Sequence, residues 1–216
     1  MTAKDKEAVP YRAKVEYDDS KSERYDHRPE WRNEPEMALL EPALRLFSPG
    51  CKVLDAPCGA GRVSVRLSEL GMQVTSVDIA PAMLERTREK LRPFGASERV
   101  QSADLEKLVF PDRSFEAVVC FRFFHHLPNE TLRKQVISEL CRVANQYVVM
   151  SFYHPISLHN LKRYLGTKLL GKPQRRFSIR PQDLAAIFAT HGFQQVQVTA
   201  QRKYLSTLWL AVFKRA

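Results

Sequence analysis

The stretch VLDAPCGAGR, residues 53–62, decides the fold of this chain of 216 residues. It starts as an apolar run typical of a buried strand and ends in two closely spaced glycines, Gly59 and Gly61. The apolar residues that follow recur at helical spacing: Val63, Leu67 and Leu70. The stretch therefore predicts a strand, a tight turn and a helix. In a parallel sheet, the turn after the first strand is the usual seat of a nucleotide.

The rest of the chain alternates short β-rich runs with helical patterns. Seven runs are bounded by glycine, proline or polar clusters: residues 51–56, 73–78, 99–104, 115–121, 146–152, 193–200 and 206–214. Apolar residues recur at helical spacing over 132–143, and a further helix is expected between Pro181 and His191. The last two runs lie too close together for a crossover, so they predict an antiparallel hairpin. We expect an α/β fold with a mostly parallel sheet and helices on both faces.

Composition indicates one domain with a sizeable core, since 44% of the residues are hydrophobic and 27% are charged. No apolar run is long enough to span a bilayer, and the first ten residues lack the apolar region of a secretory signal. We therefore expect a cytoplasmic protein. The four cysteines have no CxxC spacing, so neither a disulfide framework nor a metal site is expected. The formal net charge of +10 favours an anionic partner or surface.

Two aspartates follow the first two strands at the edge where ligands collect. Asp78 ends the second strand, where a carboxylate can accept hydrogen bonds from the hydroxyl groups of a ribose. Asp55 stands at the mouth of the turn, where it repels the pyrophosphate of a dinucleotide and favours a cationic or amino-bearing nucleoside. The alternative is a glycine turn that only packs the helix against the strand.

Three segments of the chain resemble, in the same order, motifs of the class I S-adenosylmethionine-dependent methyltransferases. VLDAPCGAGR is similar to their first motif, with Pro57 in place of its first glycine. VTSVDIAPAML, residues 74–84, resembles the second-strand motif, and SADLEKLVFPDRSFEAVVCFRFFHHL, residues 102–127, resembles the segment through the fourth strand. The likeness covers roughly residues 45–153. It is closest to the small-molecule branch that includes quinone-type methyltransferases.

This resemblance implies a Rossmann-like sheet of seven strands and S-adenosyl-L-methionine as the cofactor. It places Asp78 against the ribose and the carboxylate of Asp104 against the adenine amino group. The cofactor-binding residues that it implies are Asp55, Ala56, Pro57, Gly59, Gly61, Asp78, Ile79, Met83, Asp104, Leu105 and Phe121.

Methyl transfer by in-line displacement depends chiefly on holding a nucleophile behind the activated methyl group. A hydroxyl acceptor also gains about 100-fold from a base that takes its proton. His125 and His126, directly after the fourth strand, are the candidate catalytic residues. The alternative is that one caps or orients the next helix and the other packs in the loop. Arg122 is a candidate for binding an acidic acceptor or the cofactor carboxylate, or for pairing with a surface acid.

Residues 1–32 are dense in charges of both signs and poor in aliphatic side chains, which is typical of a mobile arm or lid. We expect the methyltransferase domain to span residues 33–216. The arm carries aromatic and arginine side chains that could cover a bound cofactor: Tyr25, Arg28, Trp31 and Arg32.

A basic helical insert is expected at about residues 154–180. Seven positive charges and no acidic residue occur between His154 and Gln182. Leucines recur at helical intervals through the same segment, so residues 158–180 are candidates for peripheral contact with an anionic membrane at its inner face. A solvated face over an ordinary hydrophobic stripe and a dimer contact are the alternatives.

These features favour methyl transfer to oxygen of a small-molecule or lipid-like acceptor. An RNA methyltransferase is one alternative because of the basic charge, although CFRFFHH lacks the Asn/Asp-Pro-Pro-aromatic motif of amino-group nucleobase methylases. A second alternative is a non-catalytic scaffold protein that binds the cofactor without turnover.

Overall fold

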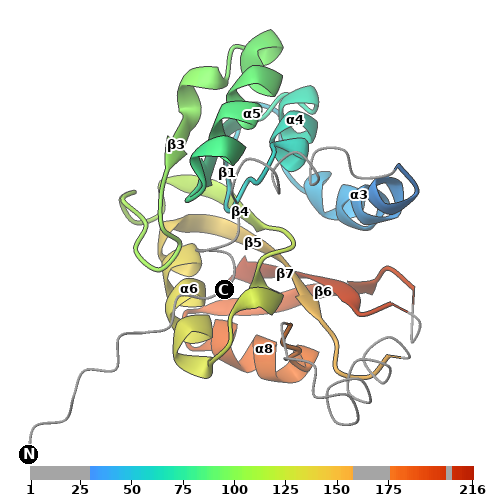
Figure 1. Ribbon diagram of the computed structural model, residues 1–216. Coiled ribbons are helices and arrows are strands. Elements are labelled where there is room, and N and C mark those ends of the chain that lie inside the picture. The colour runs from blue at the N-terminus through green and yellow to red at the C-terminus, as the bar shows by residue number, and fades with distance from the viewer. Residues whose placement is uncertain (1–29, 158–175, 203–205) are drawn as a thin grey trace, which may run out of the picture.

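The computed structural model describes residues 30–157, 176–202 and 206–216. Its centre is a seven-stranded sheet in the order β3-β2-β1-β4-β5-β7-β6 (Figure 1). The strands are β1 (Lys52–Asp55), β2 (Gln73–Asp78), β3 (Val100–Ser102), β4 (Phe115–Cys120), β5 (Ala144–Tyr153), β6 (Phe193–Ala200) and β7 (Leu208–Arg215). The α-helices are α3 (Glu30–Leu44), α4 (Arg62–Glu69), α5 (Pro81–Leu91), α6 (Glu130–Val143) and α8 (Pro181–Ala189). The described residues also form three short 3₁₀ helices: η1 (Arg92–Phe94), η2 (Ser97–Arg99) and η3 (Phe124–His126).

The direction of the strands confirms the expected mostly parallel sheet. β1 lies parallel to both β2 and β4, while β3 and β5 extend the parallel part on either side. β6 and β7 form the antiparallel hairpin, and β7 also pairs antiparallel with β5. The hairpin therefore folds back so that its second strand joins the sheet and β6 becomes the edge. The strand order reverses between β1 and β4, and ligands bind at such a switch point in open α/β sheets.

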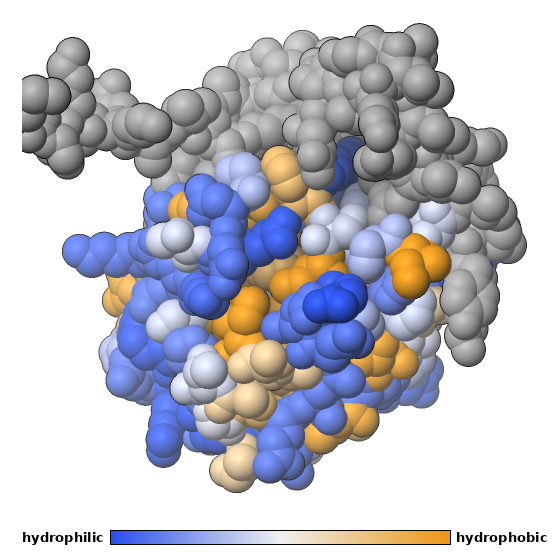
Figure 2. Space-filling view, turned by 90° about the horizontal axis from the view of Figure 1, so that it is seen from below, coloured by the Kyte–Doolittle hydropathy of each residue, from blue (hydrophilic) through white to orange (hydrophobic). Residues whose placement is uncertain are grey.

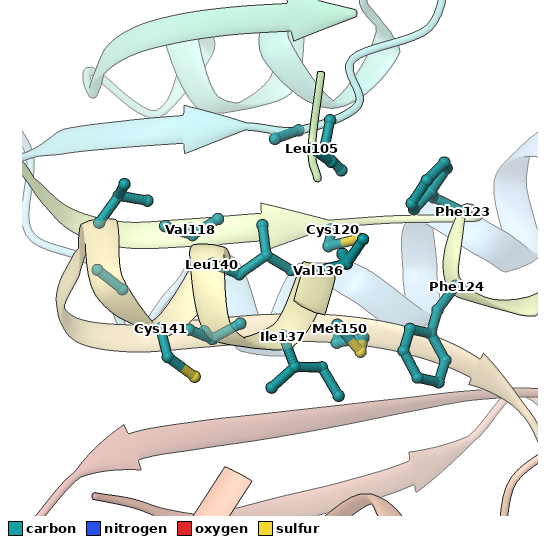
Figure 3. Packing of buried hydrophobic residues seen from close by; sticks show 14 of the residues in the cluster. Leu105, Val118, Cys120, Phe123, Phe124, Val136, Ile137, Leu140, Cys141 and Met150 are labelled. Carbon is teal, nitrogen blue, oxygen red and sulfur yellow. The ribbon is translucent and has the colours of Figure 1, made fainter. Parts of the chain in front are cut away.

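Alternating strand residues supply two cores, one on each face of the sheet. Val53 of β1 packs with α3 and α4, whereas the next residue, Leu54, belongs to the core beneath α6 and α8. Figure 3 shows Val136, Ile137 and Leu140 of α6 in this second core. Both faces are covered, as a parallel sheet requires.

The loop after β4 leads into α6 through a capping contact. Asn129 precedes the helix, and its side-chain oxygen accepts a hydrogen bond of 2.8 Å from the backbone N–H of Leu132. Asn129 is therefore the N-cap of α6. The alternative role of a histidine as this cap is not confirmed, because His125 and His126 lie earlier, in η3.

The helix α3 begins at Glu30, so the expected boundary between residues 32 and 33 falls inside a helix. The C-terminal half of α3 packs on the sheet, since Leu40 and Leu44 belong to the core cluster that contains residues of β1 and β4. Viewed from below, hydrophobic side chains reach the surface in small areas between hydrophilic ones (Figure 2).

Candidate active site

The turn between β1 and α4 is in close contact with α5. Gly59 and Gly61 have φ values of +53° and +80°, which glycine adopts without strain. A Cβ atom on Gly61 would lie 2.9 Å from Oγ1 and 3.1 Å from Cα of Thr87 in α5. The hydroxyl of Thr87 donates a hydrogen bond of 2.8 Å to the Gly59 carbonyl. The glycines therefore shape the turn and also let α5 pack against it.

Asp78 connects the ends of β1 and β2. Its carboxylate accepts hydrogen bonds of 2.9 Å from the backbone N–H of Gly59 and of 2.9 Å from that of Ala80. Burial raises the pKa of Asp78, and these N–H donors oppose the rise. Each carboxylate oxygen keeps a second lone pair, so the hydroxyl groups of a ribose can still donate to it.

Asp55 is fully buried at the end of β1. Its Oδ2 accepts a hydrogen bond of 2.6 Å from the hydroxyl of Ser64, which in turn accepts one of 2.8 Å from Ser76. Its Oδ1 is buried and has no hydrogen-bond partner among the residues that the structure describes. Burial raises the pKa of Asp55 to about 7. An unpartnered carboxylate oxygen beside the glycine turn fits a ligand that brings a positive charge or an amino group.

The other residues expected around the adenine lie just after β2, in α5 and just after β3. Ile79 is 37% exposed after Asp78, whereas Met83 is buried against Ala60 and Ala80. Asp104 follows β3 and accepts a hydrogen bond of 3.0 Å from the N–H of Glu106, and Leu105 is buried beside it.

Ala56, Pro57 and Phe121 lie at the switch point itself. The N–H of Ala56 donates a hydrogen bond of 2.9 Å to Val119 of β4, and the Ala56–Pro57 peptide bond is cis. Phe121 follows β4 and is buried, with the guanidinium of Arg62 5.3 Å from its ring centroid. The structure thus brings the residues expected at the cofactor site to one edge of the sheet.

The two histidines differ in environment. His125 is fully buried and stacks on Tyr153, with ring centroids 3.9 Å apart. Its Nε2 lies 2.9 Å from Nη1 of Arg176, and an arginine can only donate, so Nε2 accepts. His126 is only partly buried. His125 therefore already uses the lone pair that a base needs, and His126 is the more accessible of the two.

Arg122 has an internal rather than a surface ion pair. Its Nη1 lies 3.2 Å from Oε1 of Glu36, whose side chain is 6% exposed. Glu36, on α3, also pairs with Arg62 at 2.7 Å. The N–H of Arg122 donates a hydrogen bond of 2.6 Å to Ser151 of β5. These contacts join α3, α4 and the ends of β4 and β5.

Glu36 and Tyr153 are site residues that were not singled out from the sequence, and Arg176 stood there only as one charge of the basic insert. Tyr153 had a usable signal, because it ends a strand parallel to β4 and must reach the same edge. Glu36 had none, since it comes from a helix far from the motifs in sequence.

The structure describes only part of the predicted arm. Tyr25 and Arg28 lie outside the described residues, as does the part of the basic insert at 158–175. Trp31 and Arg32 belong to the first turn of α3, and the structure does not describe their side chains.

Comparison with known proteins agrees with this site. A family model described as a methyltransferase domain matches residues 53–146. A ubiquinone biosynthesis O-methyltransferase of Xanthomonas campestris is 36% identical over 165 residues, covering 73% of this chain and 68% of that protein. A magnesium-protoporphyrin O-methyltransferase of Synechocystis is 28% identical over 172 residues, covering 76% of this chain and 73% of that protein.

Solved structures share the fold. The crystal structure of magnesium protoporphyrin IX methyltransferase from Synechocystis with bound SAH has a TM-score of 0.68 at 22% identity, covering 85% of this chain and 82% of that one. The strand order, the glycine turn beside two carboxylates and these relatives agree. The chain therefore belongs to the class I S-adenosylmethionine-dependent methyltransferases, as a member of their small-molecule branch.

Proposed function

We propose that this protein transfers the methyl group of S-adenosyl-L-methionine to an oxygen atom of a small-molecule acceptor. The observation that carries the proposal is the pair of buried carboxylates, Asp55 and Asp78, around the glycine turn at the switch point. The two O-methyltransferase relatives support oxygen as the accepting atom.

The residues in and around the turn have separate roles in the proposed cofactor binding. Asp78 would accept hydrogen bonds from the ribose hydroxyl groups, and the unpartnered Oδ1 of Asp55 would accept from an amino group or lie against a positive charge. Gly59 and Gly61 would let the backbone approach the ligand without a side chain between them. When bound, the cofactor supplies an activated methyl group, so the protein must mainly orient the acceptor and exclude water.

His126 is the proposed base. It ends η3, in the connection between β4 and α6, and its ring centroid is 4.3 Å from that of His125. In this role it would take the proton of the acceptor hydroxyl as the oxygen–methyl bond forms and the methyl–sulfur bond of the cofactor breaks, which leaves S-adenosylhomocysteine and a protonated histidine. His125 is a positioning residue, because Arg176 and Tyr153 hold its ring in place.

The first test is calorimetric titration of the full chain with S-adenosylhomocysteine. We expect binding, and a loss of about tenfold or more in the Asp78→Asn variant, because a charged acceptor of hydrogen bonds is replaced. Asp183→Asn, in the first turn of α8 and with a side chain that is 43% exposed, is the matched control and should bind as the parent does. Equal affinity in Asp78→Asn and the parent would argue against this site.

The second test follows tritiated methyl groups from the cofactor into fractionated metabolite, lipid and RNA pools. Label in an oxygen-linked methyl group of a small molecule supports the proposal. Label in RNA would favour the nucleic-acid alternative. Cofactor binding without label in any pool would favour the scaffold alternative.

We also propose that the acceptor is lipid-like and that the protein works in the cytoplasm, in peripheral contact with an anionic membrane. The support is the run of seven positive charges and no acidic residue between His154 and Gln182, most of which lies outside the described residues. Among the helices that the structure describes, none is long and apolar enough to cross a membrane. Cosedimentation with anionic liposomes at two salt concentrations tests the contact, and equal binding to neutral vesicles would contradict it.

A further inference from the structure

Two arginines converge on one buried phenol at the ends of β4 and β5. Tyr153 is 3% exposed, and its hydroxyl oxygen accepts hydrogen bonds of 3.2 Å from Arg122 Nη1 and of 3.0 Å from Arg176 Nη1. Both guanidinium groups also lie near its ring, at 5.8 Å and 5.7 Å from the centroid. The two cations are thus held close to each other by a neutral side chain.

Among the residues that the structure describes, the positive charge of Arg176 meets only neutral partners. Its side chain donates to Tyr153 and to Nε2 of His125, which are neutral acceptors, and no carboxylate in the described part of the chain pairs with it. Arg122 and Arg62 both pair with the same carboxylate, that of Glu36. Arg176 is only partly exposed, so water compensates its charge incompletely. An anion in contact with both guanidinium groups would gain from this excess charge.

The backbone at Arg122 is also unusual. Its φ of +65° lies in the left-handed region, which a residue with a Cβ adopts at a cost of roughly 1 kcal/mol or more. The hydrogen bond from its N–H to Ser151 Oγ holds this conformation. Backbone strain of this kind is typical of functional sites, and here it occurs at the residue that presents one of the two guanidinium groups.

We infer that Arg122 and Arg176 together bind an anionic group of the methyl acceptor, either a carboxylate or a phosphate ester. The inference rests on the proposed function for the identity of its ligand as the acceptor. Arg176 contacts His125, and the ring of His125 adjoins that of His126. An acid held by the arginines would therefore place a nearby hydroxyl of the same molecule beside the proposed base. Arg122 and Arg176 thus select acidic acceptors over neutral ones of the same shape.

The experiment compares three phenols that differ in one substituent: 3-hydroxybenzoate with a carboxylate, 3-hydroxyphenyl phosphate with a phosphate ester, and 3-hydroxybenzyl alcohol with a neutral hydroxymethyl group. Each is titrated into the full chain saturated with S-adenosylhomocysteine, and again without it. We expect at least one acid to bind about tenfold or more tightly than the alcohol. Which acid does so distinguishes a carboxylate from a phosphate.

The variant Arg176→Gln should reduce the affinity for the acid to that for the alcohol, while its affinity for S-adenosylhomocysteine stays unchanged. Arg180→Gln is the matched control, since Arg180 is exposed and pairs with Asp183. A merely structural role for Arg176 would weaken all three probes alike and would overturn the inference. Arg176→Lys, which keeps the charge, should retain part of the preference and replaces the glutamine variant if that one does not fold.

Equal affinity of the parent chain for acids and alcohol, or no binding of either acid, would also overturn the inference. The titrations without S-adenosylhomocysteine separate it from the proposed function. If the acids bind but S-adenosylhomocysteine does not, the anion site stands and the proposed function falls. If S-adenosylhomocysteine binds and the acids show no preference, the reverse holds.

Discussion

The two halves of the site are built in different ways. On the β1–β2 side, backbone groups dominate: glycines with positive φ shape the turn, and Asp78 is held by the N–H groups of Gly59 and Ala80. On the β4–β5 side, long charged side chains dominate, and Arg122 and Arg176 meet at Tyr153. A cofactor common to a large family suits a rigid backbone cradle, whereas side chains can change with the acceptor. The comparison indicates that mutations on the first side should affect folding and cofactor binding, and mutations on the second side turnover and selectivity.

The largest expected effect concerns the pH dependence of stability at Asp55. The pKa of its carboxyl is about 7 in the folded chain and has the ordinary value of about 3.8 in the unfolded chain, so between these values the folded chain binds more protons. Stability therefore falls as pH rises from about 4 to about 7, by roughly 4 kcal/mol in total. The asparagine in Asp55→Asn cannot ionise. The stability of this variant relative to the parent should therefore rise as pH increases over the same interval.

Urea denaturation of the ligand-free protein at pH 4, 6 and 8 measures this difference. Glu98→Gln, at an exposed position, is the control and should follow the parent at each pH. Parallel profiles for Asp55→Asn and the parent would show that Asp55 ionises normally in the fold.

Gly61→Ala should destabilise the protein by about 3 kcal/mol, which lowers Tm by roughly 9 °C. The added Cβ would clash with Thr87, and the φ of +80° would strain the alanine. Gly50→Ala is a matched control with a φ of +82° and no atom within 4 Å of its Cβ. It should cost only about 1 kcal/mol. Thermal denaturation measures both variants, and equal losses would mean that close packing of α5 against the turn contributes little.

On the other side of the site, His126→Gln should lower kcat by about 100-fold, because a base is lost. The affinity for S-adenosylhomocysteine should not change. Initial rates with the acceptor fraction that takes up labelled methyl groups measure the effect. His191→Gln, near the end of α8, is the control. An unchanged kcat in His126→Gln would mean that the transfer needs no base at this position.

The smallest expected effect concerns the contact that joins the two halves. Glu36→Gln leaves Arg62 and Arg122 without their shared carboxylate, and should cost about 2 kcal/mol because these side chains are largely buried. Glu85→Gln, which breaks an exposed pair with Arg88, should change stability by less than about 0.5 kcal/mol. Chemical denaturation compares the two, and a loss in Glu36→Gln no larger than in Glu85→Gln would contradict a structural role for the shared ion pair.

Local sequence patterns predicted the helices and strands well, and their first and last residues less well. β2 and β6 occupy the predicted residues, while β5 begins two residues before its predicted start and α8 ends two residues before His191. Hydrophobic alternation marks the buried middle of a strand, but its ends depend on how far the neighbouring strand continues. The position of β7 between β5 and β6 was not predicted, because a hairpin has the same sequence pattern whichever of its strands joins the sheet.

The sequence by itself determined the parallel sheet, the glycine turn and the aspartates at the strand ends. These features depend on short-range rules: positive φ requires glycine, and strand periodicity places the last residue at the sheet edge. Only the tertiary structure decided which charges meet. Glu36, Arg122, Tyr153 and Arg176 come from segments far apart in the chain, and electrostatic contacts between such segments depend on distances that no local pattern encodes.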